Sequence, residues 1–169
     1  MYKRQALAYN TAGDFNIAIG TDALKNNTTG SQNVTVGYQS TYQNTEGIQN
    51  TALGYKALEG NVSGSNNTAV GYKTLQNSSG DRNTALGTGA GNTTDTGSQN
   101  VIIGFDADVS VSDANNQIVI GYNATGAGDN TVQLGNSDIT NVKTSGTITA
   151  GAVTYPSTDG SANQVLKTD

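Results

Sequence analysis

The sequence predicts an all-β protein, a β-solenoid or β-roll of about eight repeats, each about 17 residues long. A motif of one amide residue, three small or apolar residues and a glycine recurs, and its glycines step by 17, 17, 17, 16, 17, 17 and 14 residues. Apolar residues alternate within the motif, which is the period of a strand. The chain is also rich in Asn, Thr and Gly, which are poor helix formers, and the period is too short for a pair of helices.

The motif is expected to form one short strand per repeat. It begins at Asn16, is last seen in full at Gln117, and has a shifted final copy that ends at Gly135. Stacked repeats place like residues about 4.8 Å apart, so the amide residues should form a ladder and the glycines should form corners with positive φ. These structural positions are Asn16, Gly20, Asn33, Gly37, Asn50, Gly54, Asn67, Gly71, Asn83, Gly87, Asn100, Gly104, Gln117, Gly121 and Gly135.

Alternating pairs such as Ile17 and Ile19 should point to one face of each strand, and we expect that face to pack inward. The residue between them is Ala in several repeats, for example Ala18, which suggests a second close-packed face that admits only small groups. The first position of the pair is threonine in three consecutive repeats, which raises ice binding as an alternative. Because other repeats carry Ile or Val there, an inward packing column is favoured over that alternative.

The second half of each repeat carries an aromatic residue after the glycine in many copies, then a small residue and Leu, and then a polar turn. Tyr38, Tyr55 and Tyr72 lie one repeat apart and should stack as a ladder. They are candidate surface contacts for sugar rings or for a receptor. Partly buried packing beside the corner glycines is the favoured alternative.

Each repeat has few apolar side chains to offset the entropy cost of ordering its residues. Hydrogen bonds between stacked repeats supply part of the stabilisation. A further buried surface is therefore expected, and packing against sister chains is the natural source.

The motif Asn-x-[Ala/Val]-[Ile/Val/Leu]-Gly over residues 6–135 resembles the head repeat of YadA-type trimeric autotransporter adhesins. Tandem copies such as Asn67-Thr-Ala-Val-Gly-Tyr-Lys-Thr-Leu75 also resemble repeats of phage tail fibres. The resemblance implies a left-handed parallel β-roll, a homotrimer, and an extracellular place on a virion or on a bacterial surface. The family's repeats are typically shorter, so the loops are expected to differ.

The chain is expected to divide into three parts. Residues 1–5 are predicted to be a non-native leader, because Tyr2-Lys3-Arg4-Gln5 matches the translation of a sequencing-adapter end. Residues 6–135 are the β-roll head, and residues 136–169 are a neck of extended strands. The segments 131–151 and 155–169 resemble the run that follows such heads and precedes an intramolecular chaperone, so further chain is expected beyond the neck.

Composition excludes several classes of site. The net charge is −5 and the eight basic residues are scattered, so nucleic acid is not an expected partner. The chain has no Cys and no His, which excludes thiol or imidazole nucleophiles and imidazole–metal sites. No apolar run is long enough to span a membrane, and no cofactor is predicted. Asp106, Asp108 and Asp113 are the densest acidic group and the only weak candidates for a Ca²⁺ site.

The predicted function is attachment to a host cell or surface, by a fibre or head segment that is not an enzyme. Its ligand would be a surface glycan or receptor, held by several weak contacts at once. The alternative is a passive spacer in a fibre, and a glycan depolymerase with paired carboxylates is less favoured. Exposed clustered aromatics would favour adhesion, uniformly polar loops the spacer, and converging carboxylates the enzyme.

Overall fold

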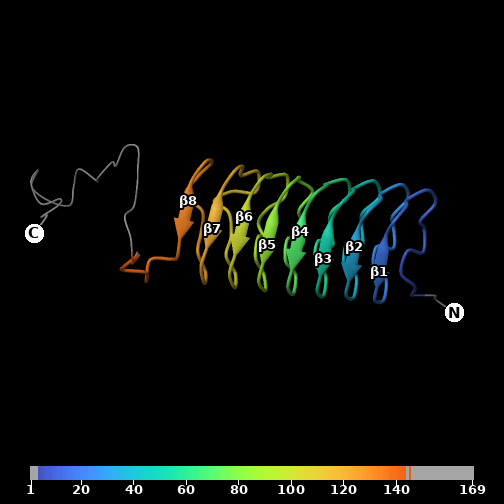
Figure 1. The fold of residues 1–169 in the computed structure, drawn as a ribbon, viewed down its shortest axis with the longest axis horizontal. Coiled ribbons are helices and arrows are strands. Elements are labelled where there is room, and N and C mark those ends of the chain that lie inside the picture. Colours follow the sequence, from blue (N-terminus) through green and yellow to red (C-terminus); the bar gives the residue numbers. More distant parts are fainter. Residues whose placement is uncertain (1–3, 144, 146–169) are drawn as a thin grey trace, which may run out of the picture. The chain divides into compact units, whose positions relative to one another are not determined.

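The computed structural model describes residues 4–143 and 145, and within them the chain is an all-β solenoid without a helix. Eight short parallel strands form one sheet in sequence order (Figure 1). The strands are β1 (Ile17–Ile19), β2 (Val34–Val36), β3 (Thr51–Leu53), β4 (Thr68–Val70), β5 (Thr84–Leu86), β6 (Val101–Ile103), β7 (Ile118–Ile120) and β8 (Val132–Leu134). The predicted fold class is therefore confirmed, with one strand per repeat. We call each turn of the solenoid a rung.

The strands pair in the register of the repeat. Ile17 of β1 pairs with Val34 of β2, one 17-residue step along the chain. Where the repeat is one residue shorter, Thr68 still pairs with Thr84, so the missing residue does not shift the sheet. The loss must be absorbed in the turns outside the strands.

The predicted direction of the strand side chains was wrong. The central residue of each strand points into the solenoid, as Ala69 and Ile102 do, both without exposed surface. The flanking residues point outward, and Ile17 and Ile19 are 53% and 60% exposed. Thr51 shares this outward position, so the threonine column does not pack inward either. The interior is narrow, so one central side chain per rung fills it together with the opposite wall.

Leucine forms the opposite wall in three rungs. Leu24, Leu58 and Leu75 are fully buried and follow the corner glycine by four residues. Gly91 takes that position one rung later, and a Cβ there would meet Leu75 Cδ2 at 2.6 Å and Ile102 Cδ1 at 3.0 Å. The larger side chain of Ile102 thus fills the space that the missing leucine leaves. The expected restriction of the inner face to small groups holds where the opposite residue is Leu.

The predicted amide ladder exists, and most of its bonds join a side chain to the backbone of the next rung, with direct amide–amide bonds at Asn33 and Asn100. Asn33 and Asn50 are buried, and the Asn50 backbone N–H donates to Asn33 Oδ1 at 2.9 Å. Asn33 Nδ2 donates to the Gly47 carbonyl at 2.9 Å. The side chain of Asn33 therefore bonds mainly to the backbone of the next rung, because its amide group points toward that rung. Gln117 ends the column, and its Nε2 donates instead to Ser110 Oγ at 2.7 Å.

The corner glycines have the predicted positive φ. Gly54 has φ +139°, and a Cβ at this site would collide with the carbonyl of Gly71 in the next rung. Left-handed backbone also occurs at residues other than glycine, such as Gln49 (φ 58°) and Leu58 (φ 56°). Each rung therefore turns through several left-handed residues, of which the corner is the one that a side chain cannot occupy.

The contacts of the chain separate a compact unit that ends at Ile139, whereas the predicted head ended at residue 135. The predicted leader (1–5) and neck (136–169) fall in large part on residues 1–3, 144 and 146–169, which lie outside the described residues.

Candidate functional site

The outward side of the sheet is a candidate interaction surface. We call it the outer face, and it consists of the first and third residues of all eight strands. The third residues form an entirely apolar column, in which Leu53 and Leu86 are 48% and 49% exposed. The members of that column are Ile19, Val36, Leu53, Val70, Leu86, Ile103, Ile120 and Leu134. The first residues are Ile17, Val34, Thr51, Thr68, Thr84, Val101, Ile118 and Val132.

A polar row precedes the outer face in the rungs of β2 to β7, whereas the exposed Phe15 takes the equivalent position before β1. Its residues lie just before the buried amide, have left-handed backbone, and are exposed. Their amide and guanidinium groups follow the edge of the sheet from rung to rung. The row consists of Gln32, Gln49, Asn66, Arg82, Gln99 and Asn116.

The aromatic residues after the corner glycines stack as predicted. The ring centroids of Tyr38 and Tyr55 lie 5.3 Å apart with an interplanar angle of 12°, and those of Tyr55 and Tyr72 lie 5.1 Å apart at 9°. Phe105 and Tyr122 form a second stacked pair at 5.8 Å. We call these five residues the aromatic column. Since the ring faces cover one another, a ligand would meet mainly ring edges and hydroxyl groups.

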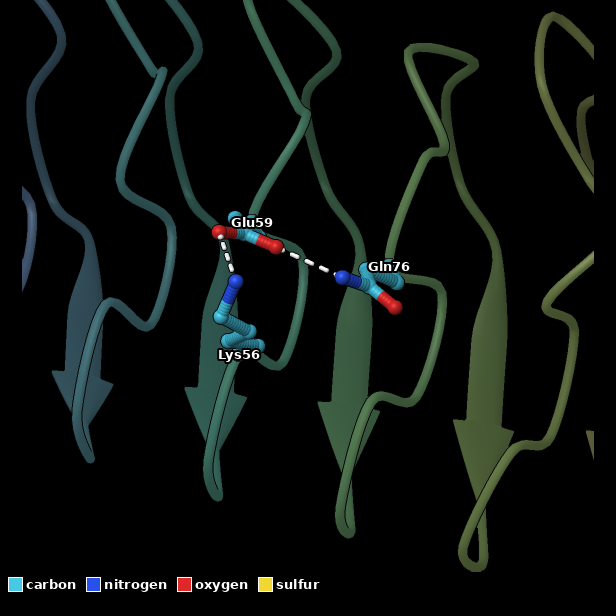
Figure 2. A network of polar contacts seen from close by, with 3 residues as sticks. All are labelled: Lys56, Glu59 and Gln76. Carbon is cyan, nitrogen blue, oxygen red and sulfur yellow. Dashed lines mark hydrogen bonds and ion pairs between the residues drawn. The ribbon is translucent and has the colours of Figure 1, made fainter.

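Polar contacts bind neighbouring rungs beside the aromatic column. Lys56 Nζ lies 2.8 Å from Glu59 Oε1, and Gln76 Nε2 of the next rung donates to Glu59 Oε2 at 2.6 Å (Figure 2). The hydrogen bond to Glu59 raises the pKa of Lys56 above its ordinary value. Lys56 Nζ also lies 5.9 Å from the ring centroid of Tyr55, within range of a cation–π contact. These side chains are engaged with one another, which favours a structural role.

The three aspartates singled out for Ca²⁺ do not form a cluster. Across the described residues, no group of three or more acidic side chains could hold a metal ion. Asp108 Oδ2 accepts the Thr93 N–H and its Oδ1 accepts the Val109 N–H, both at 2.9 Å. Burial raises the pKa of Asp108, and the nearby charge of Asp106 adds to that rise. Asp113 is exposed, so only Asp108 has a defined structural role, in a turn.

A polar groove of about 330 Å³ lies beside the last strand. It is lined by Asn123 and Thr125 of one rung, by Gln133 of β8, and by the turn after β8. Asp138 is the one carboxylate in its lining. A glycosidase of the usual kind requires two carboxylates, so this groove does not have the arrangement expected of a depolymerase.

A second asparagine column escaped the sequence analysis. Asn27 Nδ2 donates to Asn10 Oδ1 at 2.7 Å, Asn44 Nδ2 to Asn27 Oδ1 at 2.7 Å, and Asn61 Nδ2 to Asn44 Oδ1 at 3.0 Å. These residues lie 17 apart, so the period alone could have revealed them. In this column every step from Asn10 to Asn61 is a direct bond between amide side chains, whereas the first column has such bonds at Asn33 and Asn100.

A third column of residues joins the turns of neighbouring rungs by hydrogen bonds. In most rungs the side chain that follows the turn glycine, or Ala114 in one rung, accepts the backbone N–H of the equivalent residue one rung earlier. Examples are Ser65 N–H to Asp81 Oδ1 at 2.8 Å and Asp81 N–H to Ser98 Oγ at 3.0 Å. We call it the turn column. Its members are Asp14, Ser31, Ile48, Ser65, Asp81, Ser98, Asn115 and Asp129. Ile48 has no side-chain acceptor and interrupts it.

Within the part of the chain that the structure describes, no helix has the length and apolar character needed to cross a membrane. Comparison with protein-family models, with curated proteins and with solved structures found no match to this chain. The columns of the solenoid are therefore the basis for a functional assignment.

Proposed function

We propose that this chain is a structural and adhesive segment of an extracellular fibre, and that it assembles as a homotrimer through the outer face. The observation that carries the proposal is the outward apolar column of the sheet, which runs through all eight strands. Soluble monomers rarely expose a contiguous apolar surface of this extent, and such surfaces mark interaction sites.

The surroundings of the outer face support burial against other copies of the chain. Its centre carries only aliphatic and threonine side chains, while the row that includes Gln49 and Asn66 supplies amides along one edge. Protein interfaces have this arrangement, with an apolar centre and a polar rim. That three chains rather than two associate is what the resemblance to trimeric adhesin heads implies.

The adhesive part of the proposal rests on the aromatic column. Tyr55 is 41% and Tyr122 67% exposed in the single chain, and both repeat along the solenoid axis. A trimer would present three such columns, so weak contacts to a glycan or receptor would add by avidity. Two observations support the spacer alternative. The tyrosine rings stack on one another, and Lys56 forms an ion pair with Glu59, so these groups already have partners within the chain.

Light scattering on the full chain tests the assembly. We expect a stable species of about three times the chain mass of 17.3 kDa. Leu53→Glu combined with Leu86→Glu should dissociate it, because two charges per chain would have to be buried. Val62→Glu with Val111→Glu is the matched control, since these valines are similarly exposed but lie outside the strands. A folded monomer of the parent chain would contradict the proposal.

Adhesion is tested separately on the assembled protein. We expect binding to a glycan array or to host cells, with at least a tenfold loss for Tyr55→Ser combined with Tyr72→Ser, since each ring adds about 1 kcal/mol of contact. If this variant still binds, the aromatic column is not the surface that contacts the ligand. An assembled trimer that binds nothing would favour the passive spacer.

A further inference from the structure

The rungs between Asn10 and Asn61 share one regular connection on the turn side. Each asparagine of the second column donates to the one before it, at 2.7–3.0 Å. Beside it, the Thr28 N–H donates to the Thr45 carbonyl at 3.0 Å and the Thr45 N–H to the Val62 carbonyl at 2.8 Å. Side chain and backbone thus join each rung to the next.

Both connections stop at the next step. Asn61 Oδ1 and Ser78 Oγ are buried and have no hydrogen-bond partner. Among the described residues no bond joins the Val62 N–H to the Ser79 carbonyl, although this pair is equivalent to Thr45 and Val62. One rung further, Thr94 Oγ1 is buried and unpartnered as well.

The sequence explains the interruption. Asn44 and Asn61 each lie three residues before a glycine, whereas Ser78 lies two residues before Gly80, in the one 16-residue step of the array. Serine is also shorter than asparagine, so its hydroxyl cannot reach the position of the missing amide nitrogen. The turn therefore lacks these bonds to the rung before it, while the strands keep their register.

At the gap between the rungs of Asn61 and Ser78, hydrogen-bond acceptors outnumber donors. A Cβ built on Gly64 would meet Asn61 Oδ1, the Gly80 carbonyl oxygen and, at 2.8 Å, the Ser79 carbonyl oxygen. In the preceding rung, the equivalent Cβ on Gly47 meets Asn61 Nδ2 at 3.0 Å, which is a donor. The oxygens of Asn61 and Ser79 thus lie beside Gly64, at a position where the regular repeat places an amide N–H group.

We propose that this gap is a binding site for one ordered water molecule, held between the rungs of Asn61 and Ser78. A water can donate to Asn61 Oδ1 and to the Ser79 carbonyl, and accept from the Val62 N–H or from Ser78 Oγ. Buried waters are typically held by two to four such partners. A cation fits the site less well, because the Val62 N–H would point its positive end at the ion.

A high-resolution crystal structure of the full chain tests the proposal. We expect a water about 2.7–3.2 Å from Asn61 Oδ1 and from at least one of the Val62 nitrogen and Ser78 Oγ. A direct bond from the Val62 N–H to the Ser79 carbonyl, an empty gap, or an oxygen-coordinated ion with distances of about 2.3–2.6 Å would each overturn it.

Two variants extend the test in solution. Ser78→Asn with one threonine inserted after Ser79 restores the regular turn, so the water should be lost, the thermal midpoint should rise by several degrees, and Val62 amide exchange should slow to the rate of Thr45. The reverse change, Asn44→Ser with deletion of Glu46, should create a second water site and lower the midpoint. Unchanged exchange at Val62 in the first variant would contradict the proposal.

Discussion

In the interior of a rung, the central residue of the strand packs against a residue of the opposite wall, and a larger residue on one side is matched by a smaller one on the other. Ala69 on the strand faces a wall of leucine, whereas Ile102 extends into the space beside Gly91. The rung of β2 departs from this rule, because Thr35 and Thr41 are both buried and their hydroxyl oxygens are joined only by a long contact of 3.3 Å. Two buried hydroxyl groups thus replace the alanine–leucine pair of the rungs of β1, β3 and β4.

Replacing this pair by Thr35→Ala and Thr41→Leu should stabilise the protein by about 1 kcal/mol. The change removes two buried hydroxyls, and it removes a β-branched residue from left-handed backbone, since Thr41 has φ 52°. Leu58 has the same role at φ 56° without strain from branching. Thermal unfolding measures the effect, and Thr41→Leu alone should give a smaller gain because Thr35 then lacks its partner. A lower midpoint for the double variant would contradict this account of the core.

The raised pKa of Asp108 leads us to expect that the stability of the protein depends on pH. Burial raises its folded-state pKa above the ordinary value of 3.8, so the folded protein binds the proton more tightly than the unfolded chain. The free energy of unfolding should therefore fall as pH rises from about 4 through the raised pKa towards 7. Urea unfolding of the parent and of Asp108→Asn should show the parent gaining relative to the variant at the acid end of this range. Asp14→Asn, which removes an exposed carboxylate, is the control.

At the scale of the elements, the strands are only three residues long, so the turns carry much of the connection between rungs. The turn column is an example, because side-chain oxygens on one rung accept backbone N–H groups of the rung before it. Asp14 N–H donates to Ser31 Oγ at 3.0 Å, and Ile48 N–H to Ser65 Oγ at 3.1 Å. The link between Ser31 and Ile48 is missing, since Ile48 offers no acceptor.

Ile48→Ser should complete the turn column and raise the free energy of unfolding by about 0.5–1.5 kcal/mol, the usual contribution of one hydrogen bond. Amide exchange at Ser31 should slow in parallel. Val111→Ser is the matched control, because Val111 is an exposed valine outside this column. Equal effects of the two substitutions would show that lost surface hydrophobicity, and not the new bond, is responsible.

At the scale of the whole molecule, each rung contacts the rungs next to it along the sheet. Stability in such arrays is approximately a sum over rungs and their interfaces. Because the register repeats with the sequence, a rung can be removed without changing the pairs on either side of the cut. The same property lets the sheet absorb the 16-residue repeat.

Deletion of residues 51–67 removes one complete rung and joins Asn50 to Thr68, which restores an intact strand motif. We expect a folded solenoid with a moderately lower thermal midpoint, as measured by circular dichroism. Deletion of residues 51–58 alone removes half a rung and breaks the register, so this control should lose cooperative folding. If both deletions behave alike, the rungs are not independent units.

The sequence by itself determined the period, the position of all eight strands, the corner glycines and the stacking of Tyr38, Tyr55 and Tyr72, because a repeat places identical local geometry at a fixed interval. It also contained the second asparagine column and the turn column, which the same interval reveals. Only the tertiary structure decided which side of the strands lies inside. Alternation defines two faces but not their direction, and here both faces are apolar. Where leucine lines the opposite wall, the interior admits only a small central residue, so the larger pair, including Ile17 and Ile19, faces outward.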